Sequence, residues 1–319
     1  MNRESLPIMF DIISIGSSLL DIFIRSNDLE ADRDGERQIL TYGDKLELSD
    51  FHIVTGGGAS NTAVAFARLG LRAAVISETG RDEFANLITA DFQKEGVATN
   101  LLIQEKLEKT GGAVALVAKN SERVIMVHRG AASMLDPFDI PAFWLVKSKW
   151  VHLSSIGGNQ ETLAKIFKVL NNNQETKMSW NPGKKELQLL VKEKFEIAQI
   201  PCEIFFVNEE EWAMVEPLHE EILLNFPQVV ITKGKAGGEV HIFGKKAFEF
   251  VGEAESFVDS TGAGDAFAAA YVAAILDGLE VSIAISWGVK NAGNVVAYFG
   301  AKLGLLRKTQ ILELTKTKN

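Results

Sequence analysis

Residues 259 to 265 combine an anion cradle with a carboxylate that can act as a base. They read Asp-Ser-Thr-Gly-Ala-Gly-Asp, and the apolar segment that follows them predicts a helix. Since the first N–H groups of a helix lack internal partners, this turn would stabilise an anion beside Asp265. Phosphoryl transfer to a hydroxyl group requires such an arrangement. Taken alone, the heptapeptide fits equally well a tight turn in which Asp265 only complements the helix dipole.

A second segment has residue types that suit binding of a polyol. Residues 56 to 61 read Gly-Gly-Gly-Ala-Ser-Asn and lead into a predicted helix that Gly70 ends. Glycines let a ligand approach backbone N–H groups, and Asn61 can both donate and accept hydrogen bonds. Asp21, after the first predicted strand, could accept hydrogen bonds from ligand hydroxyls. The alternatives are a plain strand-to-helix turn and a strand-edge charge; a dinucleotide turn is excluded because its third glycine is missing.

Two further sites follow predicted strands and suit a nucleotide. Asn208 and Glu211 are three residues apart, so both can face one side of a helix start and supply oxygen ligands to a partly hydrated Mg2+. The turn Thr232-Lys-Gly234 could lie under a phosphate, with Lys233 adding charge. The alternatives are helix capping for the first pair and an ordinary solvated lysine for the turn. P-loop and protein-kinase signatures are absent from the sequence.

The composition sets limits on the class of protein. The chain has 319 residues, 46% of them hydrophobic, which is enough for a full core. A net charge of −9 disfavours nucleic acid and anionic membranes as partners. A single cysteine allows neither an internal disulfide nor a cysteine-based metal site. With no secretion signal and no uninterrupted apolar span, we expect a cytoplasmic protein.

Alternating strands and helices from Trp150 onward predict a doubly wound α/β fold, with a mostly parallel sheet covered by helices on both faces. Two β-rich insertions, 21–55 and 111–128, interrupt the body, which comprises 11–20, 56–110 and 129–319. Their predicted strands are 21–25, 38–42, 45–48, and a hairpin of 113–118 and 123–128 with its turn at 119–122. We expect the insertions to pair into a small sheet that acts as a lid over the carboxyl ends of the main strands, where ligands bind.

Together these segments resemble the PfkB carbohydrate kinase family, which has a ribokinase-like fold, from Asp11 to Leu305. Residues 259–265 match the carboxy-terminal signature of that family, and residues 56–70 match its amino-terminal signature. Asn208-x-x-Glu211 is similar to its magnesium motif, and Thr232-Lys-Gly234 is similar to its nucleotide turn. Gly80-x-Asp82-x-Phe84 also occurs in the family.

The resemblance implies a reaction and a role for each matched residue. Asp265 would take the proton of the acceptor hydroxyl, and the N–H groups of Gly262, Ala263 and Gly264 would form the anion hole for the transferred phosphoryl group. The implied acceptor-binding residues are Asp21, Gly57, Gly58 and Asn61.

The resemblance also implies ATP and Mg2+ as cofactors. Asn208 and Glu211 would organise Mg2+, partly through water, and Thr232, Gly234 and Ala292 would contact the nucleotide. Asp259 and the turn from Gly300 to Gly304 would hold a monovalent cation such as K+, as in several members of the family.

The acceptor itself is open at this stage. Gly-x-x-Leu-Leu-Asp21 is similar to adenosine kinases, whereas Gly56-Gly-Gly also occurs in sugar kinases. We rank a ribose- or hexose-type sugar first as the acceptor and a nucleoside second. A non-catalytic sugar-binding regulator is the third hypothesis, and it predicts loss of Asp265 or of the glycines. The lid sheets of the family often pair, so a homodimer through the lid is expected.

Overall fold

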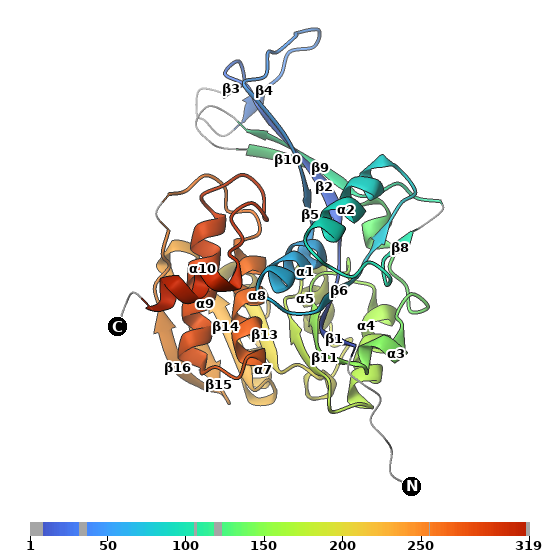
Figure 1. Ribbon diagram of the computed structural model, residues 1–319, viewed down its shortest axis with the longest axis vertical. Coiled ribbons are helices and arrows are strands. Elements are labelled where there is room, and N and C mark those ends of the chain that lie inside the picture. The colour runs from blue at the N-terminus through green and yellow to red at the C-terminus, as the bar shows by residue number, and fades with distance from the viewer. Residues whose placement is uncertain (1–8, 32–36, 105–106, 118–122, 255, 317–319) are drawn as a thin grey trace.

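A mixed sheet of eight strands forms the centre of the protein (Figure 1). This computed structural model describes residues 9–31, 37–104, 107–117, 123–254 and 256–316. The six strands from β6 to β14 run parallel; β15 pairs antiparallel with β14, and β16 pairs antiparallel with β15. In spatial order they are β16 (Lys245–Phe250), β15 (Gly238–Ile242), β14 (Gln228–Thr232), β13 (Ile204–Asn208), β12 (Lys177–Trp180), β11 (Ser148–Leu153), β1 (Phe10–Ile15) and β6 (Ala73–Ile76).

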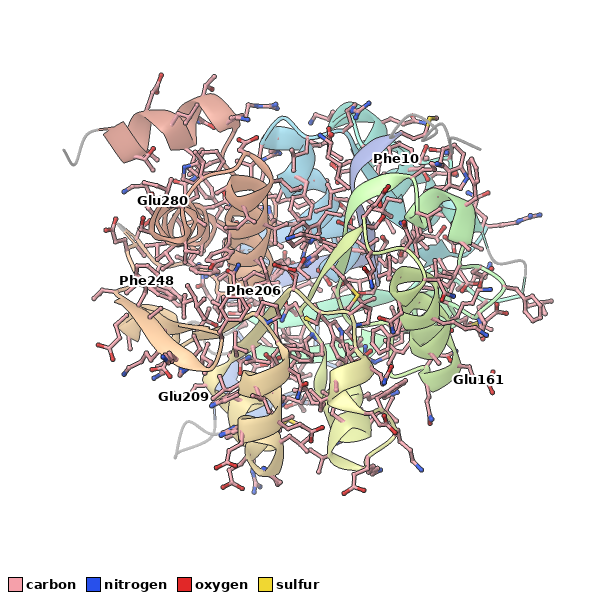
Figure 2. All side chains as sticks on the ribbon, turned by 90° about the horizontal axis from the view of Figure 1, so that it is seen from below. Phe10, Glu161, Phe206, Glu209, Phe248 and Glu280 are labelled. Carbon is pink, nitrogen blue, oxygen red and sulfur yellow. The ribbon has the colours of Figure 1, made fainter. Side chains whose placement is uncertain are left out.

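Helices cover both faces of this sheet, because neighbouring residues of its buried strands point to opposite sides. Ile12 belongs to one apolar cluster and Ile13 to the other. The first cluster takes residues from α1 (Gly58–Arg68), α2 (Glu83–Lys94), α8 (Ala263–Leu276), α9 (Val281–Val295) and α10 (Lys308–Lys316). The second takes residues from α3 (Ala142–Leu145), α4 (Gln160–Asn171), α5 (Lys184–Val191), α6 (Glu209–Met214) and α7 (His219–Asn225). Figure 2 shows side chains filling the space between the sheet, at Phe206, and the helices that begin near Glu161, Glu209 and Glu280.

A separate four-stranded sheet projects from this body (Figure 1). Its order is β10 (Arg123–His128), β9 (Gly112–Val117), β2 (Leu19–Arg25) and β5 (Asp50–Gly56), so both insertions contribute strands to it. β2 and β9 are parallel, and the two outer pairs are antiparallel. Two short strands, β3 (Glu30–Ala31) and β4 (Gln38–Ile39), extend the first insertion, and β7 (Glu78–Thr79) pairs with β8 (Ile103–Gln104).

The predicted fold class is confirmed, with local differences. The predicted strand at residues 45–48 is absent, and β5 forms directly after it instead, because all seven of its residues pair with β2. α1 begins at Gly58 rather than at Thr62, while α5 and α7 were not predicted. The predicted turn at residues 119–122 lies outside the described residues. The residue limits of body and lid stay predictions.

Within the described part of the chain, no helix is both long enough and apolar enough to cross a membrane.

Candidate active site

The first turn of α8 carries the two glycines of the heptapeptide at the centre of the site. Gly262 caps the helix with a left-handed backbone, φ 77°, and a Cβ there would lie 2.2 Å from the Ala301 Cβ. Only glycine fits such a position without strain. Gly262 and Gly264 line one cavity with Asp265, and Gly264 lines a second cavity with Ala263. The Ala263 N–H donates to the Ser260 carbonyl at 3.2 Å, so in this conformation it is already engaged.

Asp265 contacts the glycine-rich segment that lies 204 residues earlier in the chain. The Asn61 amide, in the first turn of α1, donates from Nδ2 to Oδ2 of Asp265 at 2.8 Å. Burial raises the pKa of Asp265 to about 6, the bond from Asn61 opposes this shift, and the nearby charge of Glu211 adds to it. A carboxylate with such a pKa accepts a proton near neutral pH more readily than a solvated aspartate does.

Three consecutive glycines join β5 to α1, and they lie close to both Asp21 and Asp265: Gly56 ends β5, Gly57 caps α1 and Gly58 begins it. A Cβ on Gly56 would lie 2.2 Å from Oδ2 of Asp21, and a Cβ on Gly58 would lie 2.6 Å from Oγ of Ser154 and 3.8 Å from Oδ1 of Asp265. Any side chain at these positions would displace one of the carboxylates or the serine. The backbone of residues 56–58, called the glycine loop below, therefore packs directly against Asp21 and Ser154.

Asp21 is itself a perturbed carboxylate. Burial raises its pKa to about 6, the charge of Asp259 adds to the shift, and Lys302 opposes it. Asp259 is 2% exposed; its Oδ1 accepts from the N–H and Oγ1 of Thr261, and its Oδ2 accepts from the Gly300 N–H. Asp259 thus orders the loop before α8.

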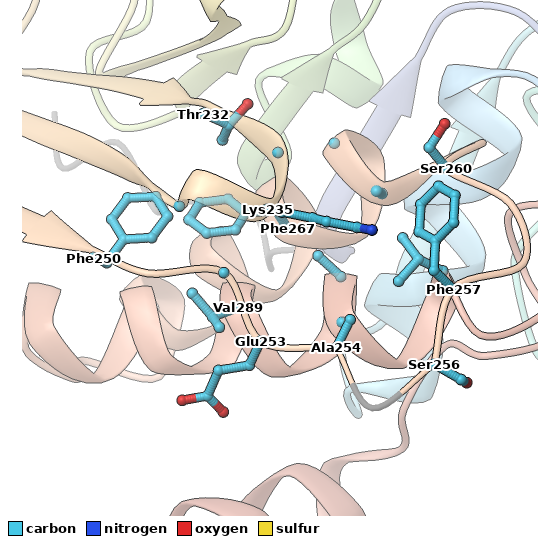
Figure 3. A pocket seen from close by; sticks show the side chains of 18 residues that line it. Thr232, Lys235, Phe250, Glu253, Ala254, Ser256, Phe257, Ser260, Phe267 and Val289 are labelled. Atoms are coloured by element: carbon cyan, nitrogen blue, oxygen red, sulfur yellow. The ribbon is translucent and has the colours of Figure 1, made fainter.

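Two adjoining cavities lie at the start of α8. The smaller, about 180 Å³, is lined by Asp265, Asn208 and Glu211, and the larger, about 500 Å³, is lined by Gly234 and Ala292. Both cavities are lined by Thr232, Gly264 and Phe267. Figure 3 shows the larger cavity, where Phe250 and Phe267 lie side by side with ring centroids 5.3 Å apart. A flat apolar ring fits such a wall.

Asn208 and Glu211 cap α6 reciprocally. Oδ1 of Asn208 accepts from the Glu211 N–H at 2.8 Å, and Oε2 of Glu211 accepts from the Asn208 N–H at 2.9 Å. Burial raises the pKa of Glu211. The capping alternative is thus correct, yet both residues also line the smaller cavity. No cluster of three or more His, Cys, Asp or Glu side chains that could hold a metal occurs among the described residues. A carboxylate and an amide suit an Mg2+ ion whose other ligands are phosphates and water.

One lysine does not take its expected position, and two others were not expected at all. Lys233 turns away from the cavity, because its ammonium pairs with Glu239 at 3.1 Å. Lys235, which sequence reasoning missed, lines the larger cavity and lies over the Phe257 ring at 4.5 Å (Figure 3). Lys302 was also missed, although a lysine between Ala301 and Leu303 in an apolar turn is an unusual sequence feature.

Comparison with known proteins identifies the family. The model of the pfkB family of carbohydrate kinases matches residues 9–308, and the chain therefore belongs to that family. A fructokinase of Vibrio alginolyticus is 26% identical over 280 residues, covering 81% of this chain and 90% of that protein. A ribokinase of Bacillus subtilis is 26% identical over 310 residues, covering 96% of this chain and 99% of that protein.

The solved structures confirm the ribokinase-like fold. A nucleoside kinase of Methanocaldococcus jannaschii, described as an archaeal member of the ribokinase family, superposes with a TM-score of 0.80 at 22% identity. The match covers 98% of this chain and 100% of that one. The expected family and enzyme class, a carbohydrate kinase, are thus confirmed.

Proposed function

We propose that this kinase transfers the γ-phosphoryl group of ATP to a hydroxyl group of a small sugar of ribose or hexose type. The contact between Asn61 and Asp265 carries the proposal. It fixes a carboxylate of raised pKa between the glycine loop, where a polyol would bind, and the two adjoining cavities, where a nucleotide would bind.

In the proposed mechanism the protein supplies position and charge. Asp21 and the loop N–H groups hold the acceptor, and Asp265 accepts the proton of its hydroxyl as the oxygen attacks. The N–H groups of Gly262 and Gly264 face the charge that develops on the phosphoryl oxygens. Because the transition state is largely dissociative, proton transfer is late and a weak base suffices. Closure of the small sheet over the acceptor would exclude water and strengthen these interactions.

The nucleotide would lie across both cavities, with its base against Phe250 and Ala292 and its phosphates near Thr232 and Gly234. Mg2+, when bound, would neutralise charge on the phosphates. Glu211 and Asn208 would hold the water ligands of this ion. Because the Glu211 carboxylate is partly buried, a nearby cation would stabilise its charged form.

The test is ATP consumption with Mg2+ across a panel of pentoses, hexoses and nucleosides. Consumption with one or more sugars supports the proposal. Consumption with nucleosides alone overturns it in favour of a nucleoside kinase. No turnover with any compound, combined with ligand-induced thermal shifts, would instead indicate a non-catalytic regulator, although Asp265 and both helix-start glycines are retained.

One observation favours the nucleoside alternative. Leu19 Cδ1 lies 3.6 Å from the position that a Cβ on Gly56 would occupy, so an apolar side chain adjoins Asp21 at the glycine loop. The flat face of a base could pack on it.

A monovalent cation near Asp259 is part of the same proposal. The Asp259 carboxylate lies against the turn that starts at Gly300, whose carbonyl groups are suitable ligands for K+. Potassium should then raise kcat or lower KM for ATP; equal activity in potassium and tetramethylammonium salts would count against the site.

We also propose a homodimer through the small sheet. On one face, eight apolar side chains and no charged one come into register across β10, β9, β2 and β5; none of them is buried. They are Ile22, Ile24, Phe51, Ile53, Val114, Leu116, Val124 and Met126. Monomers rarely expose such a continuous apolar face, and a second copy offers an identical one. Light scattering should give a dimer that Ile53→Lys converts to a monomer; a monomeric wild type contradicts the proposal.

A further inference from the structure

The loop between α9 and α10 carries a buried lysine to the edge of the small sheet. Lys302 is 9% exposed, and its ammonium donates hydrogen bonds to three side chains. Their oxygens are Asp91 Oδ2 on α2 at 2.8 Å, Thr55 Oγ1 on β5 at 2.8 Å and Ser60 Oγ on α1 at 2.6 Å. One ammonium thus uses all three of its donors on three different elements.

The ammonium is held firmly at this position. Arg68 donates from Nη1 to the carbonyl oxygens of Lys302 at 2.8 Å and Leu305 at 2.9 Å, which fixes the loop backbone. Thr55 also donates to Oδ2 of Asp91 at 2.5 Å. Burial alone would raise the pKa of Asp91, but Lys302, the Thr55 hydroxyl and Arg68 together lower it below its usual value. Burial lowers the pKa of Lys302, and Asp91 opposes that shift. The lysine and the aspartate therefore form an ion pair, as a buried charge requires.

Two of the three partners flank the glycine loop. Thr55 immediately precedes Gly56, and Ser60 immediately precedes Asn61, which bonds Asp265. Three consecutive glycines lose more backbone freedom on ordering than other residues do. A rigid connection between the two ends of such a loop reduces its remaining freedom without contacting the ligand.

We propose that Lys302 is a positioning residue that fixes both ends of the glycine loop, and thereby the acceptor and the Asn61–Asp265 pair. This inference rests on the proposed function, since it assigns the loop to the acceptor. It differs from a purely structural ion pair, because pairing with Asp91 alone would stabilise the fold without affecting where the loop lies.

The test compares Lys302→Met, which keeps the length of the side chain and removes all three donors, with two controls. Lys308→Met removes another lysine of an ion pair, with Asp277. Leu170→Ala creates a cavity in the other apolar cluster, so it lowers stability away from the site. In Lys302→Met, kcat should fall and KM for the acceptor should rise, so that kcat/KM for the acceptor falls about 10- to 100-fold. KM for ATP should stay within about twofold, and the controls should keep both kinetic constants.

A second readout does not depend on turnover. Hydrogen exchange of the amides of residues 56–61 should be about tenfold or more faster in Lys302→Met than in wild type, and unchanged in Leu170→Ala. If the wild type phosphorylates no acceptor, the proposed function fails while the exchange result still tests the loop. Equal exchange and equal kinetic constants for the folded variant would overturn the positioning role.

Milder variants cover the case in which Lys302→Met does not fold. Thr55→Val and Ser60→Ala each release one end of the loop and keep the Lys302–Asp91 pair. Each should give a smaller change of the same kind, in KM for the acceptor and in amide exchange. No change in either variant would contradict the proposal.

Discussion

The Asn61 amide lies 2.8 Å from Oδ2 of Asp265, and this contact joins the first turns of α1 and α8. Asn61 is 5% exposed, and its Oδ1 has no hydrogen-bond partner among the described residues. A buried hydrogen-bond acceptor without a partner costs free energy, so a ligand hydroxyl that donates to this oxygen would be bound favourably. One side chain can therefore orient both the base and the acceptor.

Replacement of Asp265 by asparagine should abolish the base and keep the fold. We expect kcat to fall on the order of 100-fold or more, the scale of general-base loss. The pKa of Asp265 is raised to about 6, so the stability it contributes when protonated is lost as the pH rises through 6. Asp265→Asn should therefore raise Tm relative to wild type at pH 8 and less so at pH 4. Asp277→Asn, at the other end of α8, is the matched control; unchanged kcat in Asp265→Asn would remove the assigned role.

The pH dependence of kcat/KM for the acceptor should show an acid limb near pH 6. Burial raises the pKa values of both Asp265 and Asp21 to about 6. Asp265 must be ionised to take up the proton, and an ionised Asp21 accepts hydrogen bonds from the sugar more strongly than its neutral form does. Activity should fall about 100-fold per pH unit well below 6, because two protons are gained. In Asp21→Asn the slope should be about tenfold per unit. A limb near pH 4 in the wild type would show that neither carboxylate is perturbed.

Removal of the Asn61 amide should shift the same acid limb. The Nδ2 bond opposes the raised pKa of Asp265, so Asn61→Ala should move its limb to higher pH. Loss of a hydrogen bond to a charged group should also lower kcat by on the order of tenfold. Thr62→Ala, one residue further along α1, is the control. An Asn61→Ala profile that coincides with the wild type would mean that the contact is absent in the working enzyme.

Lys235, rather than Lys233, should contribute to nucleotide binding. Lys235 lines the larger cavity, whereas Lys233 pairs with Glu239. Lys235→Ala should raise KM for ATP about fivefold, corresponding to the roughly 1 kcal/mol of an exposed ionic contact. Lys233→Ala serves as the control and should leave KM for ATP unchanged. The reverse pattern would mean that the turn rearranges when nucleotide binds.

Acid should destabilise the fold through His152. This side chain is fully buried on β11, its Nδ1 lies 2.8 Å from Oγ of Ser179, and burial lowers its pKa to about 3. Because the unfolded chain takes up the proton near pH 6.5, the contribution of His152 is complete above 6.5 and is lost as the pH falls toward 3. The slope from this group approaches about 1.4 kcal/mol per pH unit. The free energy of unfolding, measured with denaturant between pH 4.5 and 7, should change less steeply with pH in His152→Gln than in wild type.

Strong local signals made much of the fold predictable from the sequence. β11 contains the mostly apolar segment 150–153, and α4 has an asparagine cap and an apolar face, so both were expected near their observed positions. β5 was missed because Asp50 and His52 interrupt its pattern, and only pairing with β2 makes it a strand. α5 was missed because its start has no capping side chain from Gly183; Glu186 supplies the contact instead.

Patterns within the chain were enough to identify the family, the alternation of strands and helices, and the residue types at the start of α8. Those features are local, because caps, glycine turns and apolar periodicity act within a few residues. Folding alone reveals that Asn61 bonds Asp265, that Lys235 and not Lys233 lines the cavity, and that Lys302 joins both ends of the glycine loop. These relationships depend on burial and on partners up to 247 residues away in the chain, which local sequence patterns do not encode.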